Sequence, residues 1–230
     1  MIRFILKSVG RRLGRYGVLV GMTAFGIMAV VMIQGVTAGM KQNAIEGSAR
    51  YIGGRYVVLE RSGGGGAPTY IDAPDRILTA IEAAGYHPRL TVLREVVQSE
   101  NYPTLVYNGE SFEMRKVYGV DALNEAEVLA QLEFVAGGFS HLAGSKGILI
   151  SRQVAERLGL AVGDALVLQV VNRNGYLDSA NLVVQGIFQD ASLFGYYNAY
   201  MDVDALRTLI GDPAGVYRAM GFYFSGRDDP

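Results

Sequence analysis

Few side chains in this sequence have the types and the spacing that catalysis requires. The chain has two histidines, His87 and His141, and no cysteine. His141 follows Ser140 in the glycine-rich stretch GGFSHLAG, but adjacent residues rarely point at each other and the sequence has no Gly-x-Ser-x-Gly elbow. His87 precedes Pro88 in a predicted turn. We therefore predict no catalytic residue and expect that the protein is not an enzyme.

The sequence has no pattern typical of a metal or cofactor site. A zinc site would need cysteines or a His-Glu-x-x-His pair, and the sequence has neither. Asp202 and Asp204 resemble part of a calcium loop, but the glycine and the closing glutamate of that loop are absent, so Asp202 is better explained as a helix cap. The four glycines at 63–66 lead into Ala-Pro-Thr rather than the Gly-Lys-Ser/Thr of a phosphate-binding loop. We expect no cofactor, and a separate subunit would have to hydrolyse any ATP.

The apolar run at residues 16–40 fixes the location of the chain. It contains no charged residue, and about 20 apolar residues in a helix span a bilayer core. Basic residues precede it, whereas no acidic residue occurs before Glu46. Because positively charged flanks stay in the cytoplasm, this asymmetry predicts a cytoplasmic N-terminus in a bacterial inner membrane and an extracytoplasmic remainder. The basic residues are Arg3, Lys7, Arg11, Arg12 and Arg15.

A cleaved signal peptide is the alternative for this run. It would also begin with basic residues, and Val36-x-Ala38 is an acceptable cleavage pattern. The apolar part of a signal peptide is usually ~7–15 residues long, so the greater length here favours a retained helix. We therefore divide the chain into a cytoplasmic basic segment (1–15), a transmembrane helix (16–40) and an extracytoplasmic domain (41–230), which forms either one body or two lobes.

Residues 1–15 have the pattern of an amphipathic basic helix. Lys7, Arg11 and Arg15 lie four residues apart, and apolar residues occupy another side. Such a helix can lie against anionic membrane lipid or bind a cytoplasmic partner, and a plain topology signal explains it equally well. The net charge of -1 gives no reason to expect nucleic acid as a partner.

The patterns after residue 40 favour an α+β domain, because helices and strands are interspersed without strict alternation. The predicted strands are 55–61, 90–98, 104–107, 112–120, 147–150, 165–171, 182–188, 197–201 and 216–224. Four helices are predicted between them, and the N-caps that we expect are Asp72, Asn124, Ser151 and Asp202.

Turn signals set the other borders of these elements. Asn108-Gly109 predicts a tight hairpin turn. Gly159 is expected to end a helix in the left-handed conformation, after which Leu160 and Val162 pack back onto the domain.

Several aromatic residues lie near glycine-rich connections, and most of them are expected in the core. Residues 194–197, Phe-Gly-Tyr-Tyr, cannot all face one side of a strand, so one or two of these aromatics are expected at the surface. Exposed aromatic side chains mark binding surfaces. The candidate partner contacts are therefore Phe194, Tyr196 and Tyr197 outside the membrane, and Lys7, Arg11 and Arg15 inside it.

Four stretches, taken in order, resemble one protein family. GILISRQVAERLGLAVGDALVLQV (147–170) resembles the strand, helix, Leu-Gly-x-x-x-Gly-Asp turn and strand of the MacB-type periplasmic core domain. The basic start with one apolar helix, VYGVDA (117–122) and NAYMDVDALRTLIG (198–211) are similar to other parts of that family. These domains occur in ABC transporter permeases of the MacB, lipoprotein-releasing and FtsX-like group.

The resemblance implies a permease component of an ABC-type export or mechanotransmission system. Its extracytoplasmic domain would engage cargo or partner proteins, a separate ATP-binding subunit would supply energy, and further permease subunits or membrane helices would complete the transporter. A family permease continues with three more membrane helices, whereas this sequence ends at residues 227–230 without a second apolar span. We therefore expect a fragment or truncated form. The alternative is a single-span envelope binding or adaptor protein that has no ATPase partner.

Overall fold

The computed structural model describes residue 17 and residues 20–39, 56–60, 70–98, 101, 103–189 and 197–224, with backbone only for 56–60 and 98. The chain separates into two compact units, Met1–Glu46 and Gly47–Pro230. The predicted contacts Lys7, Arg11, Arg15, Phe194 and Tyr196 lie outside the described residues.

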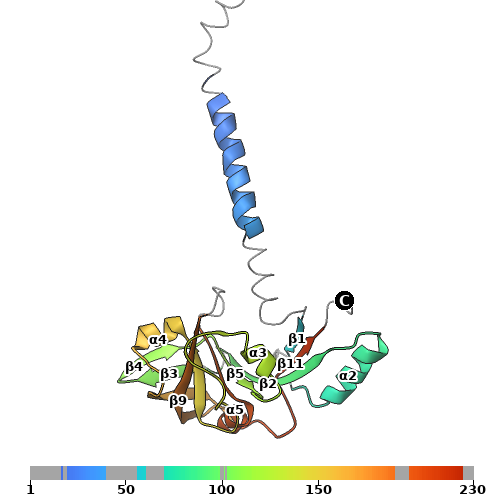
Figure 1. The fold of residues 1–230 in the computed structure, drawn as a ribbon, viewed down its shortest axis with the longest axis vertical. Coiled ribbons are helices and arrows are strands. Elements are labelled where there is room, and N and C mark those ends of the chain that lie inside the picture. Colours follow the sequence, from blue (N-terminus) through green and yellow to red (C-terminus); the bar gives the residue numbers. More distant parts are fainter. Residues whose placement is uncertain are drawn as a thin grey trace, which may run out of the picture. The chain divides into compact units, whose positions relative to one another are not determined.

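The first unit contains an apolar helix, Val20–Gly39, whose mean hydropathy is 1.8 (Figure 1). None of this helix is buried by the rest of the chain, and residues such as Phe25 and Met22 expose most of their side chains. A helix of 20 residues has the length needed to cross a bilayer. Among the described residues it is the one helix long and apolar enough to do so.

The second unit mixes helices and strands, which confirms the predicted α+β class. The strands are β1 Tyr56–Glu60, β2 Leu90–Gln98, β3 Thr104–Tyr107, β4 Glu110–Glu113, β5 Lys116–Val120, β6 Glu133–Gly137, β7 Gly147–Ser151, β8 Ala165–Val171, β9 Leu177–Gln189, β10 Asn198–Asp202 and β11 Ala219–Tyr223. The helices are α2 Pro74–Ala83, α3 Ala126–Leu129, α4 Arg152–Leu158 and α5 Val203–Ile210.

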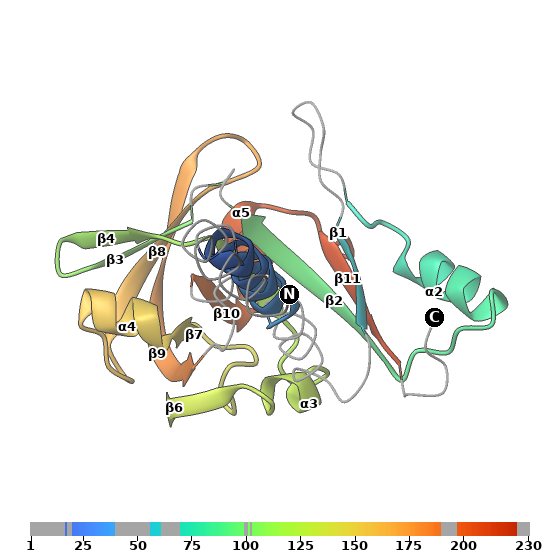
Figure 2. The same cartoon turned by 90° about the horizontal axis from the view of Figure 1, so that it is seen from above.

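The described strands form one mixed sheet in the order β1-β11-β2-β5-β10-β7-β9-β8-β3-β4, with β6 paired to β9. The pairs β5–β10 and β7–β9 are parallel, and the other pairs are antiparallel. Figures 1 and 2 both place α2 beside β1 and β11 at one end of the domain, and α4 with β3 and β4 at the other end. The strand β2 lies between these two groups of elements.

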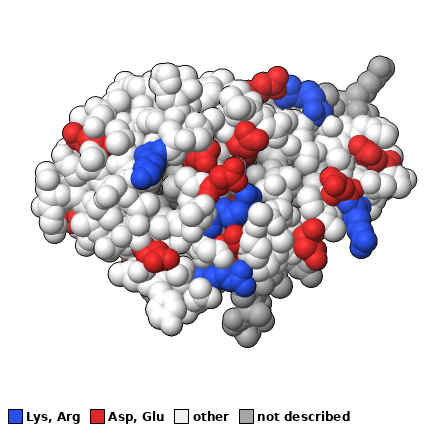
Figure 3. Space-filling view, turned by 90° about the horizontal axis from the view of Figure 1, so that it is seen from below, with Lys and Arg blue, Asp and Glu red and all other residues white. Residues whose placement is uncertain are grey.

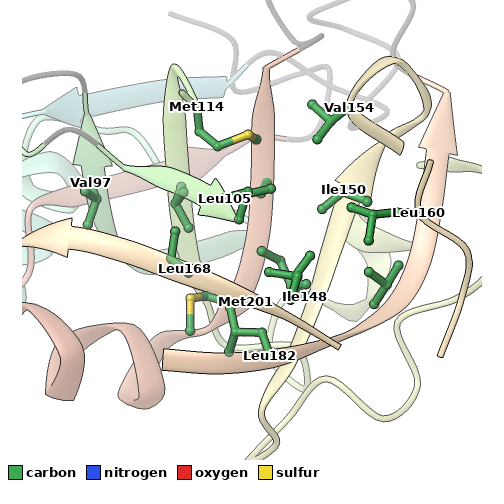
Figure 4. Close-up of a cluster of buried hydrophobic side chains, with 14 of the residues drawn as sticks. Val97, Leu105, Met114, Ile148, Ile150, Val154, Leu160, Leu168, Leu182 and Met201 are labelled. Carbon is green, nitrogen blue, oxygen red and sulfur yellow. The ribbon is translucent and has the colours of Figure 1, made fainter. Parts of the chain in front are cut away.

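The largest hydrophobic core lies under β7 to β10 and is covered by α4 and α5 (Figure 4). Ile148, Ile150, Leu168 and Met201 from the sheet are fully buried there. A separate cluster lies between α2 and β11, where Met220, Phe222 and Phe224 pack against the half-buried face of α2. These two clusters share no residue.

Several local predictions are confirmed. Asn108 and Gly109 form the β3–β4 turn with φ angles of 48° and 82°. Gly159 ends α4 in the left-handed conformation with φ 66° and ψ 35°. Asp202 caps α5, since its carboxylate accepts hydrogen bonds from the backbone N–H groups of Asp204 and Ala205.

Two predicted caps are wrong. Ala73 rather than Asp72 is the N-cap residue of α2, and Pro74 begins the helix. Glu125 rather than Asn124 is the N-cap residue of α3, because the Asn124 side chain instead donates a hydrogen bond to the carbonyl of Thr91, 3.1 Å away. In both cases the helix begins later than the local pattern indicates.

Some predicted segments also have different borders. The expected strand 112–120 is broken into β4 and β5 where the chain changes partners: the N–H of Met114 still bonds Pro103, next to β3, at 2.7 Å, whereas the N–H of Arg115 bonds the carbonyl of Tyr197 at 2.9 Å. β9 begins at Leu177, earlier than predicted, and β11 is shorter than predicted. Leu160 packs into the core as expected, but Val162 stays 43% exposed.

Candidate functional site

Tyr197 is the one predicted contact residue that lies within the described part of the chain. Its side chain is 45% exposed, and its ring lies 5.5 Å from the ring of Phe112. Its carbonyl accepts a hydrogen bond from the N–H of Arg115 at 2.9 Å. The residue before β10 is therefore fixed by backbone and ring contacts while it presents part of an aromatic ring to solvent.

The histidines lie away from any cluster of polar groups that could act on a substrate. His87 and His141 are both exposed, and so is Ser140. The carbonyl of His141 accepts a hydrogen bond from Gln185, which ties this loop to β9. Within the described residues, no group of three His, Asp or Glu side chains is arranged to hold a metal ion.

The most unusual group of charges lies at the middle of β2. Arg94 and Glu95 are adjacent there, and because strand residues alternate, their side chains point to opposite faces of the sheet. β2 also changes partners at this point. Arg94 is paired with Ala219 of β11, and Glu95 is paired with Gly119 of β5. The two charges therefore mark the junction between two parts of the sheet.

On one face, Arg94 forms a buried ion pair with Glu125 at the start of α3. The guanidinium donates two hydrogen bonds to one carboxylate oxygen, the one from Nε at 2.7 Å, and a third to the hydroxyl of Tyr223 at 3.0 Å. The Glu125 side chain is completely buried. Burial raises the pKa of the Glu125 carboxyl above its usual range, although Arg94 opposes this rise. The pair joins α3 to β2 and β11.

On the other face, Glu95 belongs to a network that we call the Glu95 network: Glu95, Arg207, Arg218, Asp212 and Tyr70. Glu95 accepts a hydrogen bond from Arg207 Nε at 3.2 Å, and Arg218 Nε lies 4.0 Å from its second oxygen. Arg218 donates to Asp212 at 2.7 Å, and the Tyr70 hydroxyl donates to the other oxygen of Asp212 at 2.7 Å. The network joins β2, α5, the connection between α5 and β11, and the segment before α2.

The carboxylate of Glu95 is buried but makes few hydrogen bonds and ion pairs that could offset the loss of hydration. Its side chain is 0% exposed, and its oxygen Oε2 has no hydrogen-bond partner among the described residues. Burial, reinforced by Coulomb repulsion from Asp212, raises the pKa of Glu95 to about 7, while Arg207 and Arg218 oppose the rise. Glu95 therefore changes its charge near neutral pH, at the junction of the sheet.

A glycine makes room for this network. Gly119 lies opposite Glu95, and a Cβ atom there would approach Val203 Cα to 3.0 Å, Glu95 Cβ to 3.1 Å and Leu206 Cβ to 3.2 Å. Only a residue without a side chain lets the first turn of α5 lie this close to the sheet. That position brings Arg207, one turn further along α5, within reach of Glu95.

The outer members of the network extend it to the surface. Arg207 also pairs with Asp204 at 2.5 Å, and its guanidinium carbon lies 4.9 Å from the ring centre of Tyr217. On the face shown in Figure 3, acidic and basic side chains lie side by side rather than forming a patch of one sign. This arrangement suits interactions within the domain better than the capture of a highly charged ligand.

The sequence did contain a signal for this site. Arg94 and Glu95 interrupt a run of Leu, Val and Thr that reads as a buried strand. A charge in such a strand needs a partner of opposite sign, because burying an unpaired charge is expensive. The pattern identifies these two residues, but it does not identify Glu125, Arg207, Arg218 or Asp212 as their partners.

The described residues thus combine one apolar helix, long enough to cross a membrane, with a mixed sheet that follows it. The model of the MacB-like periplasmic core domain matches residues 19–224, and the chain belongs to this family. The family is one of ABC-type transporter permease components.

Among solved structures, one similar chain is the periplasmic region of MacB from Actinobacillus actinomycetemcomitans. It is 13% identical in sequence, with a TM-score of 0.48 and coverage of 78% of each chain. No curated protein sequence matches this chain.

Proposed function

We propose that this chain is a permease component of an ABC-type export or mechanotransmission system, anchored in the bacterial inner membrane. The observation that carries the proposal is the family match over residues 19–224, which takes in the apolar helix and the sheet domain together. In this proposal the N-terminus is cytoplasmic, residues 16–40 form the membrane helix, and residues 41–230 form the extracytoplasmic domain.

The energy for transport comes from a separate ATP-binding subunit. The sequence has no Gly-x-x-x-x-Gly-Lys-Ser/Thr loop that could hold the phosphates of ATP. The basic segment 1–15 is the cytoplasmic surface that this chain offers to such a subunit, alongside other permease subunits or membrane helices. Lys7, Arg11 and Arg15 are its charged contacts, and membrane lipid is their second partner.

The extracytoplasmic domain engages cargo or partner proteins. Tyr197 supports this role because it holds an aromatic ring partly in solvent on a fixed backbone. Phe194 and Tyr196 are proposed to belong to the same contact surface. Aromatic side chains of this kind supply much of the binding energy in protein interfaces.

The test is co-purification from membranes of the native host. The tagged chain, in its full-length context, should retain an ATP-binding subunit, and reversing Lys7, Arg11 and Arg15 to Glu should weaken that association. Because the same charges orient the helix, the topology of the variant has to be checked with a reporter fusion. Matched substitutions at exposed Glu110 and Glu113 of β4, outside the proposed cytoplasmic surface, provide the control. If the wild-type chain retains no ATPase, the single-span adaptor replaces the permease.

A further inference from the structure

The domain has a polar seam between two apolar cores. On the face of β2 that carries Glu95, the neighbouring inward residues are Leu93 and Val97. Leu93 packs with the α2–β11 cluster, whereas Val97 belongs to the large core under α4 and α5. Glu95 lies between them, so the Glu95 network fills the boundary where one apolar core ends and the other begins.

The opposite face of β2 repeats this arrangement. Val92 packs with Val128 and Tyr223, and the next inward residue is Arg94 with its partner Glu125. Charged groups therefore occupy the middle of β2 on both faces of the sheet. We call the part formed by β1, α2, β11 and residues 90–94 the outer half, and the remainder of the sheet domain the inner half.

The chemistry of the seam decides how it separates. Opening an apolar boundary exposes hydrocarbon to water and gains nothing in return. Opening a charged boundary breaks ion pairs, but it returns the ions to water and recovers the hydration that burial removed. A boundary made of charges is thus a place where a domain opens locally before it unfolds as a whole.

We propose that the seam is a latch: the outer half opens from the inner half at the middle of β2, and the charge state of Glu95 sets how readily it opens. The inference concerns the sheet domain itself and does not depend on an ATPase partner. It assigns to Glu95 a conformational role that the family match does not supply.

The groups that face Glu95 come from every element packed against it. α5 provides Arg207 and, behind it, Asp204, while the connection to β11 provides Asp212, Tyr217 and Arg218. Tyr70 reaches Asp212 from the segment before α2, and Arg173 acts on Tyr70 from the turn after β8. β5 contributes only Gly119.

The direction of the pH response follows from the pKa of Glu95, which is about 7 in the closed domain and 4.5 for an ordinary hydrated carboxyl. Between these values the closed state holds a proton that the open state releases. Raising the pH therefore favours opening: the ratio of open to closed molecules rises about 70-fold between pH 5 and pH 8 through Glu95. The extracytoplasmic side of a membrane is where such changes of pH reach a protein directly.

Thiol labelling of the full chain in detergent can test the latch, because the sequence has no cysteine of its own. Ala219→Cys places a buried thiol at the seam, and Ala199→Cys places a buried thiol in the inner half. Ala80→Cys on the exposed side of α2 gives the intrinsic reactivity at each pH. The labelling rate at position 219, divided by the rate at position 80 at the same pH, should rise about 70-fold from pH 5 to pH 8. It should also exceed the labelling rate at position 199, divided in the same way.

Two variants connect the response to Glu95. Glu95→Gln should strongly reduce the pH dependence at position 219 and leave the part that buried Glu125 contributes, whereas Glu127→Gln, at an exposed carboxylate, should leave the response intact. Asp212→Asn removes a negative charge that raises the pKa of Glu95. The pH at which the rise in labelling at position 219 is half complete should therefore be lower in this variant. Equal labelling at positions 219 and 199 at every pH would overturn the latch, and so would an unchanged pH response in Glu95→Gln or an unmoved midpoint in Asp212→Asn.

Discussion

Gly119→Ala is the sharpest test of how α5 is held against the sheet. The added Cβ atom would lie 3.0, 3.1 and 3.2 Å from Val203 Cα, Glu95 Cβ and Leu206 Cβ. Ordinary carbon contacts are about 3.5–4.0 Å, so α5 must move away by several tenths of an ångström. Val203 Cα is a backbone atom and cannot rotate aside. Overpacking of this kind costs about 1–3 kcal/mol, and the movement also lengthens the contact between Arg207 and Glu95.

The assay is thermal or urea unfolding of the sheet domain, followed by circular dichroism. For a domain of this size, a loss of 1–3 kcal/mol lowers Tm by about 3–10 °C. Gly138→Ala is the matched control, since a Cβ atom at position 138 meets no atom within 4 Å, and its stability should change little. A Gly119→Ala protein as stable as the wild type would refute the close seating of α5 on β5.

Gly159→Val should destabilise the domain by roughly 1–3 kcal/mol, because the backbone at this position has a φ of 66°, which a residue with a branched side chain rarely adopts. No neighbouring atom crowds the position, so the loss comes from the backbone conformation alone, and urea unfolding measures it. Glu95 should lower the free energy of unfolding by about 3 kcal/mol as the pH rises from about 4.5 to about 7, because the folded state holds its proton more tightly than the unfolded chain does. Glu95→Gln should therefore reduce the slope of stability against pH, leaving the part that Glu125 contributes, and an identical slope in the variant would contradict this reasoning. A reporter fused after Pro230 should be active only outside the cytoplasm, and cytoplasmic activity would reverse the proposed topology.

Elements defined by their own residues could be predicted from the sequence. Asn108 and Gly109 tolerate the positive φ angles that their hairpin turn needs, and Gly159 does the same at the end of α4. Asp202 caps α5 with an oxygen that bonds the next turn of its own helix. In each case the conformation depends on residues within four positions, so the local pattern contains enough information.

Two of the wrong predictions have a common physical cause. Asn124 has a side chain suited to an N-cap, but it donates instead to Thr91 on β2. The strand expected through residue 114 ends there, because the next N–H, that of Arg115, bonds the carbonyl of Tyr197 at 2.9 Å. A partner far along the chain competes with the local hydrogen bond in both places, and the competition is decided only when the chain has folded.

The charged junction shows the same division most clearly. The sequence by itself determined that Arg94 and Glu95 interrupt a buried strand, that they point to opposite faces, and that each needs a partner of opposite charge. The tertiary structure decided which partners these are. Glu125 lies on the next helix along the chain, whereas Arg207 reaches Glu95 from 112 positions away, because Gly119 lets α5 approach β2. Ion pairs form between side chains that are close in space, and that closeness is a property of the packed sheet rather than of any local stretch of sequence.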